Sequence, residues 1–503
     1  MVPSSNVAAA LYEGRHPDSP VFVGLDGSVV TTAEAVRQVR RFAGALSLLG
    51  VRPGDRVSFR LEKNTETILL AQACLWFGAV LHPLNNAYTE HELSLLLADA
   101  EPALLLTTPE EYDTLRPIAE AANTRIASFS EAGGSFRLHL ENAVESEANS
   151  PPGRDGAAVL LYTSGTTGKP KGALITHENL LTSARSLAAV WRLGAGDVLL
   201  HALPIYHAHG LLTSVNSMIA GGGAILLLPS FEMTQVLAAL GKATVMMGVP
   251  THYARLVDDA AFAGAVGKNF RLAISGSAPL PISLAERFSQ IAGVPIIERY
   301  GLTEAAIVVA VPPGVGDRTG WVGWPLPAVE LRVTTQEGLR SDRGIGTLES
   351  RGPHIFAGYW RNAEATAAAF TLDGWFITGD IAEIDGSDCV RILGREKDLV
   401  ISGGLNVYPA EVEEELRRLP GVKEAAVFGV PHPDFGEGVV AAVELSASVA
   451  FDETASIAAV KSRLAAYKAP KRIVTVEAIP RNTMGKFLKA RLREEFSGLF
   501  SGK

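Results

Sequence analysis

The chain has 503 residues, of which 47% are apolar and 20% charged, and its formal net charge is −9. At roughly 100–200 residues per domain, this length suits a large body with a smaller second domain. The acidic balance and the lack of a Lys/Arg run exclude nucleic acid or an anionic membrane as the expected main partner.

The two cysteines, Cys74 and Cys389, lie in unrelated segments without metal-ligand spacing. This usage predicts reduced thiols and favours a cytoplasmic protein. The first 20 residues lack the charged and apolar regions of a secretory signal. The sequence also lacks an apolar run of about 18 residues, so we expect no membrane-spanning helix.

The first part of the chain alternates helix and strand signals. Thr31 and Glu34 form a capping-box pattern, apolar residues then recur at helical spacing, and residues 57–61 alternate like a strand. Short apolar runs indicate further buried strands at residues 103–106, 157–161, 224–228, 245–249 and 272–274. This alternation predicts an α/β fold with largely parallel sheets.

A charged stretch at residues 394–398 separates two apolar strands and indicates a domain boundary. The pattern beyond it predicts helices at 409–419 and 456–467, and strands at 425–430, 439–445 and 473–476. We therefore expect a body of residues 1–396 and a small mobile α+β domain of residues 397–503.

The segment Leu-Tyr-Thr-Ser-Gly-Thr-Thr-Gly-Lys-Pro-Lys-Gly begins at residue 161, at the end of a predicted strand. Its glycines allow tight turns, and its hydroxyls and lysines supply the donors and charge that a polyphosphate needs. It is not a Walker A loop, because its glycines are too close together and a proline follows the first lysine. A solvated turn is the alternative, but the density of donors favours phosphate binding. The expected contacts are Thr163, Ser164, Gly165, Thr166, Thr167, Gly168 and Lys169.

This segment closely resembles the phosphate loop of the acyl-adenylate-forming superfamily, which includes acyl-CoA synthetases, adenylation domains and luciferases. Other motifs of that superfamily follow in order along nearly the whole chain. They lie at residues 300–304 (YGLTE), 359–362 (YWRN), 375–380 (WFITGD), 394–398 (GREKD) and 480–486 (PRNTMGK). The resemblance implies ATP, Mg²⁺ and coenzyme A as reactants, and an acyl-AMP intermediate.

The resemblance also implies a nucleotide site. Tyr300 would stack on adenine, and Asp380 could accept from both ribose hydroxyls, with Arg395 reaching the ribose from the hinge. Glu304 is a hard oxygen ligand for Mg²⁺, helped by Thr163, and Thr303 would donate to a phosphate. The remaining expected nucleotide contacts are Gly276, Ser277, Ala278, Glu298 and Arg299.

The resemblance makes Lys486 the catalytic lysine, which would bridge the substrate carboxylate and the α-phosphate and stabilise charge during displacement. A second step, attack of a thiol on the acyl-AMP, would need the small domain to rotate about a hinge at Asp398 or Lys397. The turn at Ser402, Gly403 and Gly404 would then line a tunnel for the pantetheine arm.

Two residues bear on the acid. His207 lies where the superfamily lines the acyl pocket and would act in catalysis as well, with Ser277 and Leu302 nearby. Arg255, expected early in a helix, would bind a second carboxylate; the alternative is a surface arginine. Several segments are similar to malonyl-CoA synthetases, which implies malonate or methylmalonate. The apolar stretch at residues 305–309 departs from those enzymes and leaves other small or branched acids open.

Two further functions remain open from the residues. One is an adenylation enzyme that loads a carrier-protein thiol. The other is a non-catalytic nucleotide sensor, against which the presence of Lys486, Glu304 and Asp380 argues. The oligomeric state, monomer or homodimer, is left open.

Overall fold

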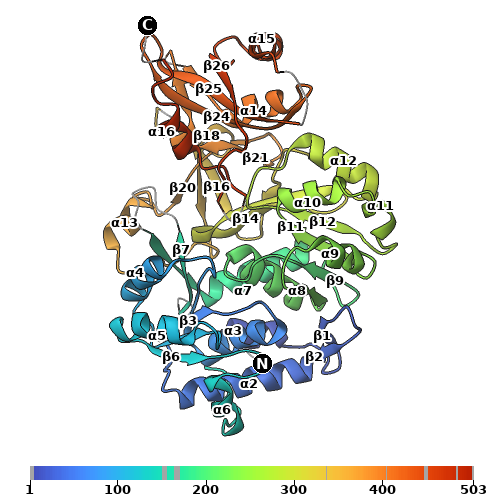
Figure 1. The fold of residues 1–503 in the computed structure, drawn as a ribbon, viewed down its shortest axis with the longest axis vertical. Coiled ribbons are helices and arrows are strands. Elements are labelled where there is room, and N and C mark those ends of the chain that lie inside the picture. Colours follow the sequence, from blue (N-terminus) through green and yellow to red (C-terminus); the bar gives the residue numbers. More distant parts are fainter. Residues whose placement is uncertain are drawn as a thin grey trace.

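The computed structural model describes residues 5–149, 156–163, 170–335, 337–403, 405–446, 451–482 and 485–500. The molecule is elongated, with the C-terminal part at one end of its long axis and the first long helix at the other (Figure 1). Within these ranges, no helix is both long and apolar enough to pass through a lipid bilayer.

The larger sheet of the body consists of β1 (Pro20–Val23), β2 (Val29–Thr31), β9 (Val198–His201), β10 (Ala224–Leu227), β11 (Val245–Gly248), β12 (Leu272–Ser275), β13 (Ile296–Leu302), β14 (Ala306–Ala310) and β15 (Trp324–Pro325). Its order is β15-β14-β13-β12-β11-β9-β10-β1-β2. The pairings from β13 to β1 are parallel, whereas β2, β14 and β15 join in antiparallel pairings.

The second sheet consists of β3 (Arg56–Arg60), β4 (Val80–Pro83), β5 (Leu104–Thr107), β6 (Arg125–Ser128), β7 (Ala157–Thr163), β8 (Lys171–Thr176) and β19 (Gly358–Tyr359). Its order is β19-β8-β7-β4-β3-β5-β6. The pairings along β7-β4-β3-β5-β6 are parallel, and β8 pairs antiparallel with both β7 and β19. Parallel strands place their carboxyl ends on one edge, where ligands of such sheets usually bind.

The helices of the body are α1 (Val7–Tyr12), α2 (Thr32–Leu48), α3 (Thr65–Phe77), α4 (Glu90–Ala100), α5 (Tyr112–Ala121), α6 (Ser135–Glu141), α7 (His177–Val190), α8 (Asn216–Gly221), α9 (Met233–Leu240), α10 (Pro250–Val257), α11 (Phe262–Ala265), α12 (Ile282–Ala292) and α13 (Ala363–Ala368), with a π-helix at Ala208–Val215. The residues of α3 from Thr67 to Phe77 are all buried. One apolar core joins α1, α2, α3 and α7 to strands of both sheets. A helix that is apolar all round is typical of such a position between layers.

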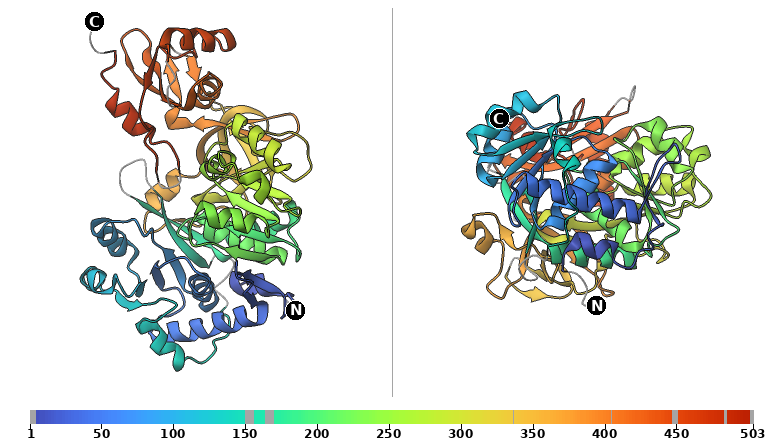
Figure 2. Two further views of the ribbon diagram at one scale, coloured as in Figure 1. Left: turned by 45° about the vertical axis from the view of Figure 1, so that its right-hand side comes forward. Right: turned by 90° about the horizontal axis from the view of Figure 1, so that it is seen from below.

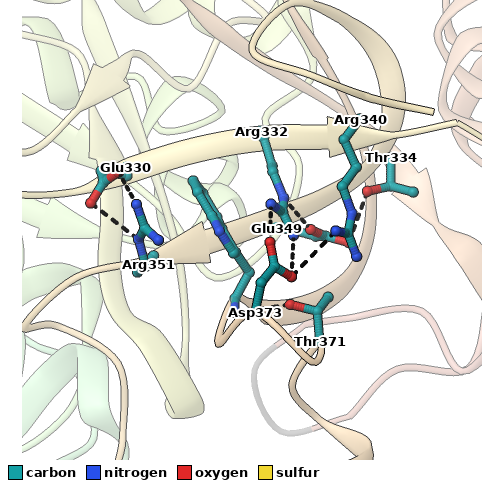
Figure 3. Close-up of polar contacts among 9 residues, drawn as sticks. Glu330, Arg332, Thr334, Arg340, Glu349, Arg351, Thr371 and Asp373 are labelled. Carbon is teal, nitrogen blue, oxygen red and sulfur yellow. Dashed lines mark hydrogen bonds and ion pairs between the residues drawn. The ribbon is translucent and has the colours of Figure 1, made fainter. Parts of the chain in front are cut away.

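An antiparallel sheet follows, made of β16 (Glu330–Thr334), β17 (Arg340–Ser341), β18 (Gly344–Arg351), β20 (Phe376–Ile384) and β21 (Val390–Arg395). On one face, Arg332 bonds to Glu349 at 2.5 Å and to Asp373 at 2.7 Å (Figure 3). Its guanidinium lies 4.3 Å from the ring centre of Trp375. This network holds the start of β20, the strand that carries Asp380. The largely parallel pattern predicted from the sequence did not include this sheet.

The C-terminal part begins with a single 3₁₀ turn at Glu396–Asp398. It contains β22 (Val400–Ser402), β23 (Leu405–Val407), α14 (Pro409–Arg417), β24 (Val422–His432), β25 (Gly436–Leu445), α15 (Glu453–Arg463), β26 (Arg472–Thr475) and α16 (Lys489–Glu495). Its sheet has a separate apolar cluster on each face, and Figure 2 shows it as a distinct lobe. This arrangement supports a boundary near residues 396 and 397, which stays a prediction.

Local signals match the structure closely. Thr31 and Glu34 form a reciprocal capping box at the start of α2, with the Thr31 N–H donating to the Glu34 carboxylate at 2.9 Å. The strand expected at residues 57–61 is β3, and the apolar run at 157–161 forms the first five residues of β7, of which the last four are buried. Cys74 and Cys389 are buried free thiols.

Candidate active site

The predicted phosphate loop joins β7 to β8. Thr163 ends β7 and pairs with Lys171 at the start of β8, and its hydroxyl donates to the Lys171 carbonyl at 3.4 Å. Lys171 lies over the ring of Tyr359, with 5.3 Å between its ammonium nitrogen and the ring centre. The rest of the predicted loop lies outside the described residues, namely Ser164, Gly165, Thr166, Thr167, Gly168 and Lys169.

The residues expected at the ribose come together from three strands. The register of β20 and β21 sets Asp380 opposite Arg395, whose Nε lies 2.8 Å from a carboxylate oxygen. Tyr300 of β13 donates its hydroxyl hydrogen to the other oxygen, and the Asp380 N–H donates to the Thr378 hydroxyl at 3.0 Å. Burial raises the pKa of Asp380, and the Arg395 cation opposes that shift. The arrangement provides a fixed carboxylate acceptor beside an aromatic ring.

Glu304 lies in the 3₁₀ turn Thr303–Ala305, directly after β13. Its Oε1 accepts from the Tyr359 hydroxyl at 3.0 Å. Because Tyr359 also contacts Lys171, Glu304 lies close to the strand that leaves the phosphate loop. Among the described residues, His, Cys, Asp and Glu side chains form no group of three or more that could hold a metal. One carboxylate plus substrate phosphates is a common donor set for Mg²⁺, so the residues fit that ion.

Lys486 lies at the junction of the C-terminal part and the body, and its side chain is exposed. Desolvation by the surrounding groups lowers the pKa of its ammonium, Arg395 lowers it further, and the charge of Asp380 opposes both. The preceding Gly485 lies against the start of α10, because a Cβ atom there would be 3.3 Å from Cγ2 of Thr251. Lys486 therefore lies close enough to the Asp380–Arg395 pair to interact with it electrostatically.

The expected hinge residues lie in the turn between the two parts. Asp398 is bonded to Arg493 of α16 at 2.6 Å, and Lys397 is exposed. Ser402 is buried at the end of β22, and Gly403 lies in an exposed turn where its N–H donates to the Phe435 carbonyl at 2.9 Å. Gly404 lies outside the described residues.

Gly276, Ser277 and Ala278 follow β12 and form a turn over the side chain of Arg299. A Cβ atom at Gly276 would lie 2.5 Å from the guanidinium carbon, so this close approach needs glycine. Ser277 has a φ angle of 72° and hydrogen-bonds through its hydroxyl to Nδ1 of His209 at 3.1 Å. Arg299 is 6% exposed, and burial lowers its pKa to about 10.

Glu298 lies on the opposite side of β13 from Arg299, as alternation along a strand requires. It accepts from the Gly320 N–H at 3.2 Å, and burial raises its pKa to about 8. Leu302 ends the same strand and pairs with Ala306.

His207 precedes the π-helix, and its ring centre lies 4.7 Å from that of Tyr206. Burial lowers the pKa of His207 to about 4, so the imidazole is neutral near pH 7. His207 and Thr303 line a small pocket of about 40 Å³. Both residues thus face one pocket, as expected if the acyl group or a phosphate binds between them.

Arg255 occupies the last turn of α10 rather than its beginning. It is exposed, bonds to the Phe231 carbonyl at 3.2 Å, and stacks on the Phe231 ring at 4.8 Å. The sequence predicted an arginine that faces a small acyl pocket, whereas the side chain of Arg255 is exposed. The contact of Arg255 with the acid stays a prediction. His252, three residues earlier, stacks on Phe231 with 4.0 Å between ring centres and is largely buried.

Sequence reasoning missed three basic residues near this site, Lys63, His201 and His252. Lys63 donates to the His201 carbonyl at 3.0 Å. Each of the three comes shortly after or at the carboxyl end of a strand, β3, β9 or β11. That placement is the signal that could have found them.

Two family matches cover most of the chain. Residues 10–360 match the AMP-binding enzyme family, and residues 411–486 match the AMP-binding enzyme C-terminal domain. The chain therefore belongs to the AMP-binding enzyme family.

Similar proteins extend the match to full length. A feruloyl-CoA synthase of Amycolatopsis sp is 35% identical, covering 93% of this chain and 94% of the relative. The mitochondrial malonate–CoA ligase of Homo sapiens is 33% identical, covering 88% and 83%. The crystal structure of ATP-bound MatB from Rhodopseudomonas palustris is 41% identical, with a TM-score of 0.93 over 99% of this chain and 100% of that one. These comparisons confirm the superfamily, the fold class and the prediction of an AMP-forming acid–thiol ligase that uses ATP and coenzyme A.

Proposed function

We propose that this AMP-forming acid–thiol ligase activates a short dicarboxylic acid, malonate or methylmalonate, and transfers it to coenzyme A. The observation that carries this proposal is the environment of Arg299. Its Nε and Nη2 are buried and have no hydrogen-bond partner among the described residues. An acid with a second carboxylate would supply that partner.

The cost of an unpaired buried cation supports this choice. Leaving a buried charge without its counter-ion costs roughly 3–5 kcal/mol, and arginine binds a carboxylate through two parallel hydrogen bonds. By contrast, the largely buried Arg332 and the partly buried Arg271 each have a carboxylate partner, Glu349 at 2.5 Å and Asp197 at 2.6 Å. Arg299 thus differs from these arginines in the way expected of a substrate-binding residue.

The apolar stretch that departed from malonate enzymes does not argue against this acid. Residues 306–310 form β14, whose side chains pack into two apolar cores. The stretch therefore supports the sheet. The malonate–CoA ligase relative favours a dicarboxylate, whereas the feruloyl-CoA synthase relative makes an aromatic acid the second candidate.

The reaction would have two half-reactions. In the first, Lys486 would hold the substrate carboxylate against the α-phosphate and stabilise negative charge as pyrophosphate leaves. Asp380 would hold the ribose, and Tyr300 would stack on adenine. Glu304 would hold Mg²⁺, which supplies charge neutralisation on the phosphates when it is bound.

In the second half-reaction, the thiol of coenzyme A would attack the acyl-AMP. Lys486 would have to move aside for the thiol to approach, so we propose rotation of residues 397–503 about Asp398 and Lys397. The turn at Ser402 and Gly403 would then replace Lys486 at the site. A carrier-protein thiol could use the same path.

An acid panel tests the proposal. AMP release with coenzyme A should be fastest with malonate or methylmalonate, and Arg299→Met should lower kcat/KM for malonate by at least about 30-fold. Arg255→Ala tests the arginine predicted from the sequence, which should lose malonate but not acetate activity if it reads a second carboxylate. A wild-type preference for ferulate or another monocarboxylate would reject the proposed substrate.

A further inference from the structure

Lys63 is a partly buried cation that the steps above do not use. It follows β3 and immediately precedes Asn64, which caps α3. Its side chain extends from the second sheet toward the larger one, and its ammonium donates there to the His201 carbonyl at 3.0 Å. Burial lowers its pKa well below the usual value. Even partial removal of a lysine ammonium from water costs free energy, which a bound anion would offset.

Lys63 belongs to a cluster of basic groups at the carboxyl ends of the strands. It interacts electrostatically with His201 and His252, and both of these histidines interact with His209. His209 in turn interacts with Arg299 at the other end. Hydrogen bonds fix the histidines in place, from His201 Nε2 to the Gly210 carbonyl at 2.8 Å and between His209 and Ser277 at 3.1 Å.

The cluster lacks negative charge. Within the described part of the chain, no Asp or Glu forms an ion pair with Lys63, Arg299 or the histidines between them. Several of their buried nitrogens also have no partner there, namely His201 Nδ1, His209 Nε2, His252 Nδ1, Arg299 Nε and Arg299 Nη2. The histidines are neutral near pH 7, because burial lowers their pKa. The positive charge of the cluster therefore comes from Lys63 and Arg299, and an anion that binds between them would also satisfy the unpaired guanidinium donors.

We propose that Lys63 binds the second carboxylate of the acid together with Arg299, and so determines the preference for dicarboxylates. The inference rests on the proposed function and names a further specificity residue for it. The ligand is a carboxylate of the acid rather than a nucleotide phosphate, because Lys63 interacts through His201 with His209, which is hydrogen-bonded to Ser277. The ribose partners Asp380 and Arg395 belong to other strands.

The test compares Lys63→Met with Lys242→Met. Lys242 is a matched control, since it also donates to a carbonyl, that of Leu25 at 2.6 Å, but is exposed. Both variants are assayed for AMP release with malonate and with propionate, which has a methyl group where malonate has its second carboxylate. We expect Lys63→Met to lower kcat/KM for malonate on the order of 100-fold and to change propionate less than about threefold. Lys242→Met should change neither, and Lys63→Arg should keep a malonate preference.

Each other outcome has a meaning. Equal losses on both acids would overturn the proposal in favour of a structural lysine, and a raised KM for ATP would assign Lys63 to the nucleotide. Unchanged malonate kinetics would overturn it as well. If Lys63→Met fails to fold, as judged by thermal unfolding, Lys63→Gln, which keeps a donor for the His201 carbonyl, must show the same split between malonate and propionate. A wild-type enzyme that ignores dicarboxylates would instead reject the proposed function itself.

Discussion

The Nε atom of Arg395 lies 2.8 Å from a carboxylate oxygen of Asp380. The pair is formed by neighbouring antiparallel strands, and Tyr300 donates to the second oxygen. A bound ribose would therefore compete with partners that Asp380 already has. The Tyr300 hydroxyl occupies a carboxylate oxygen that the ribose would need, whereas the Tyr300 ring would stack on adenine. The two parts of this side chain should therefore affect nucleotide binding differently.

We predict that Tyr300→Phe keeps nucleotide binding while Asp380→Ala loses it. The phenylalanine ring can still stack on adenine, and removal of the hydroxyl frees a carboxylate oxygen for the ribose. The KM for ATP in pyrophosphate exchange should change less than about fivefold in Tyr300→Phe and rise by about 30-fold or more in Asp380→Ala. Equal effects of the two substitutions would show that the hydroxyl itself binds nucleotide.

A second prediction concerns the division of labour between the half-reactions. Lys486→Ala should lower acid-dependent pyrophosphate exchange by about 10²–10³-fold, because it removes a positive charge from the reacting phosphate. Thioester formation from supplied acyl-AMP should stay within about threefold of wild type. Similar losses in both assays would contradict the proposed movement of the C-terminal part.

The pH dependence gives Lys486 an independent readout. Because desolvation and the nearby Arg395 lower the pKa of this lysine from 10.5, its ammonium loses the proton at a lower pH than a lysine free in water does. Pyrophosphate exchange should therefore decline on the alkaline side below pH 10.5. In Lys486→Arg, any residual activity should persist to higher pH, since guanidinium stays protonated.

Local patterns predicted much of the fold. The capping box at Thr31 and Glu34, and the apolar run that became β7, depend on residues close together in the chain, and both appear as expected. The antiparallel sheet from β16 to β21 was not predicted, because β16 and β17 are short and mostly not buried and the longer strands β18 and β20 pair over a long loop. Such pairing is decided by tertiary contacts.

The sequence predicted those residues of the candidate site that lie in recognisable motifs. Motif resemblance suggested Asp380, Tyr300 and Lys486, and the structure brings them together, but the contact between His209 and Ser277 joins residues 68 apart. The helix that carries Arg255 was expected, whereas the exposed position of its side chain depends on how α10 packs. Lys63 has no motif at all, and its role is visible only where the two sheets meet.

Glu298 leads to a prediction on stability. Burial raises the pKa of this carboxyl from 4.5 to about 8, so the folded protein holds a proton that the unfolded chain releases. Its stabilising contribution is complete below pH 4.5 and is lost as the pH rises to about 8. Glu298→Gln removes that loss. Relative to wild type, the variant's free energy of unfolding in urea should therefore rise between pH 5 and 8 by on the order of 4 kcal/mol. A constant difference across this range would contradict the raised pKa.

The network around Arg332 leads to a prediction on the sheet that carries Asp380 (Figure 3). Glu349 is 4% exposed and bonds to Arg332 and to the Thr334 hydroxyl. Arg332→Met would leave this carboxylate buried without its cation, so the free energy of unfolding should fall by about 3–5 kcal/mol. The matched control is Arg343→Met, whose pair with Asp388 is exposed and should contribute less than about 1 kcal/mol.

A double variant decides whether the unpaired carboxylate causes that loss. Replacing the partner as well, in Arg332→Met with Glu349→Leu, removes both charges and should recover most of the stability lost in Arg332→Met. Urea unfolding of the two single variants and the double variant measures the coupling between the residues. If the double variant is as unstable as Arg332→Met, the loss comes from the stacking of Arg332 on Trp375, 4.3 Å away, and not from Glu349.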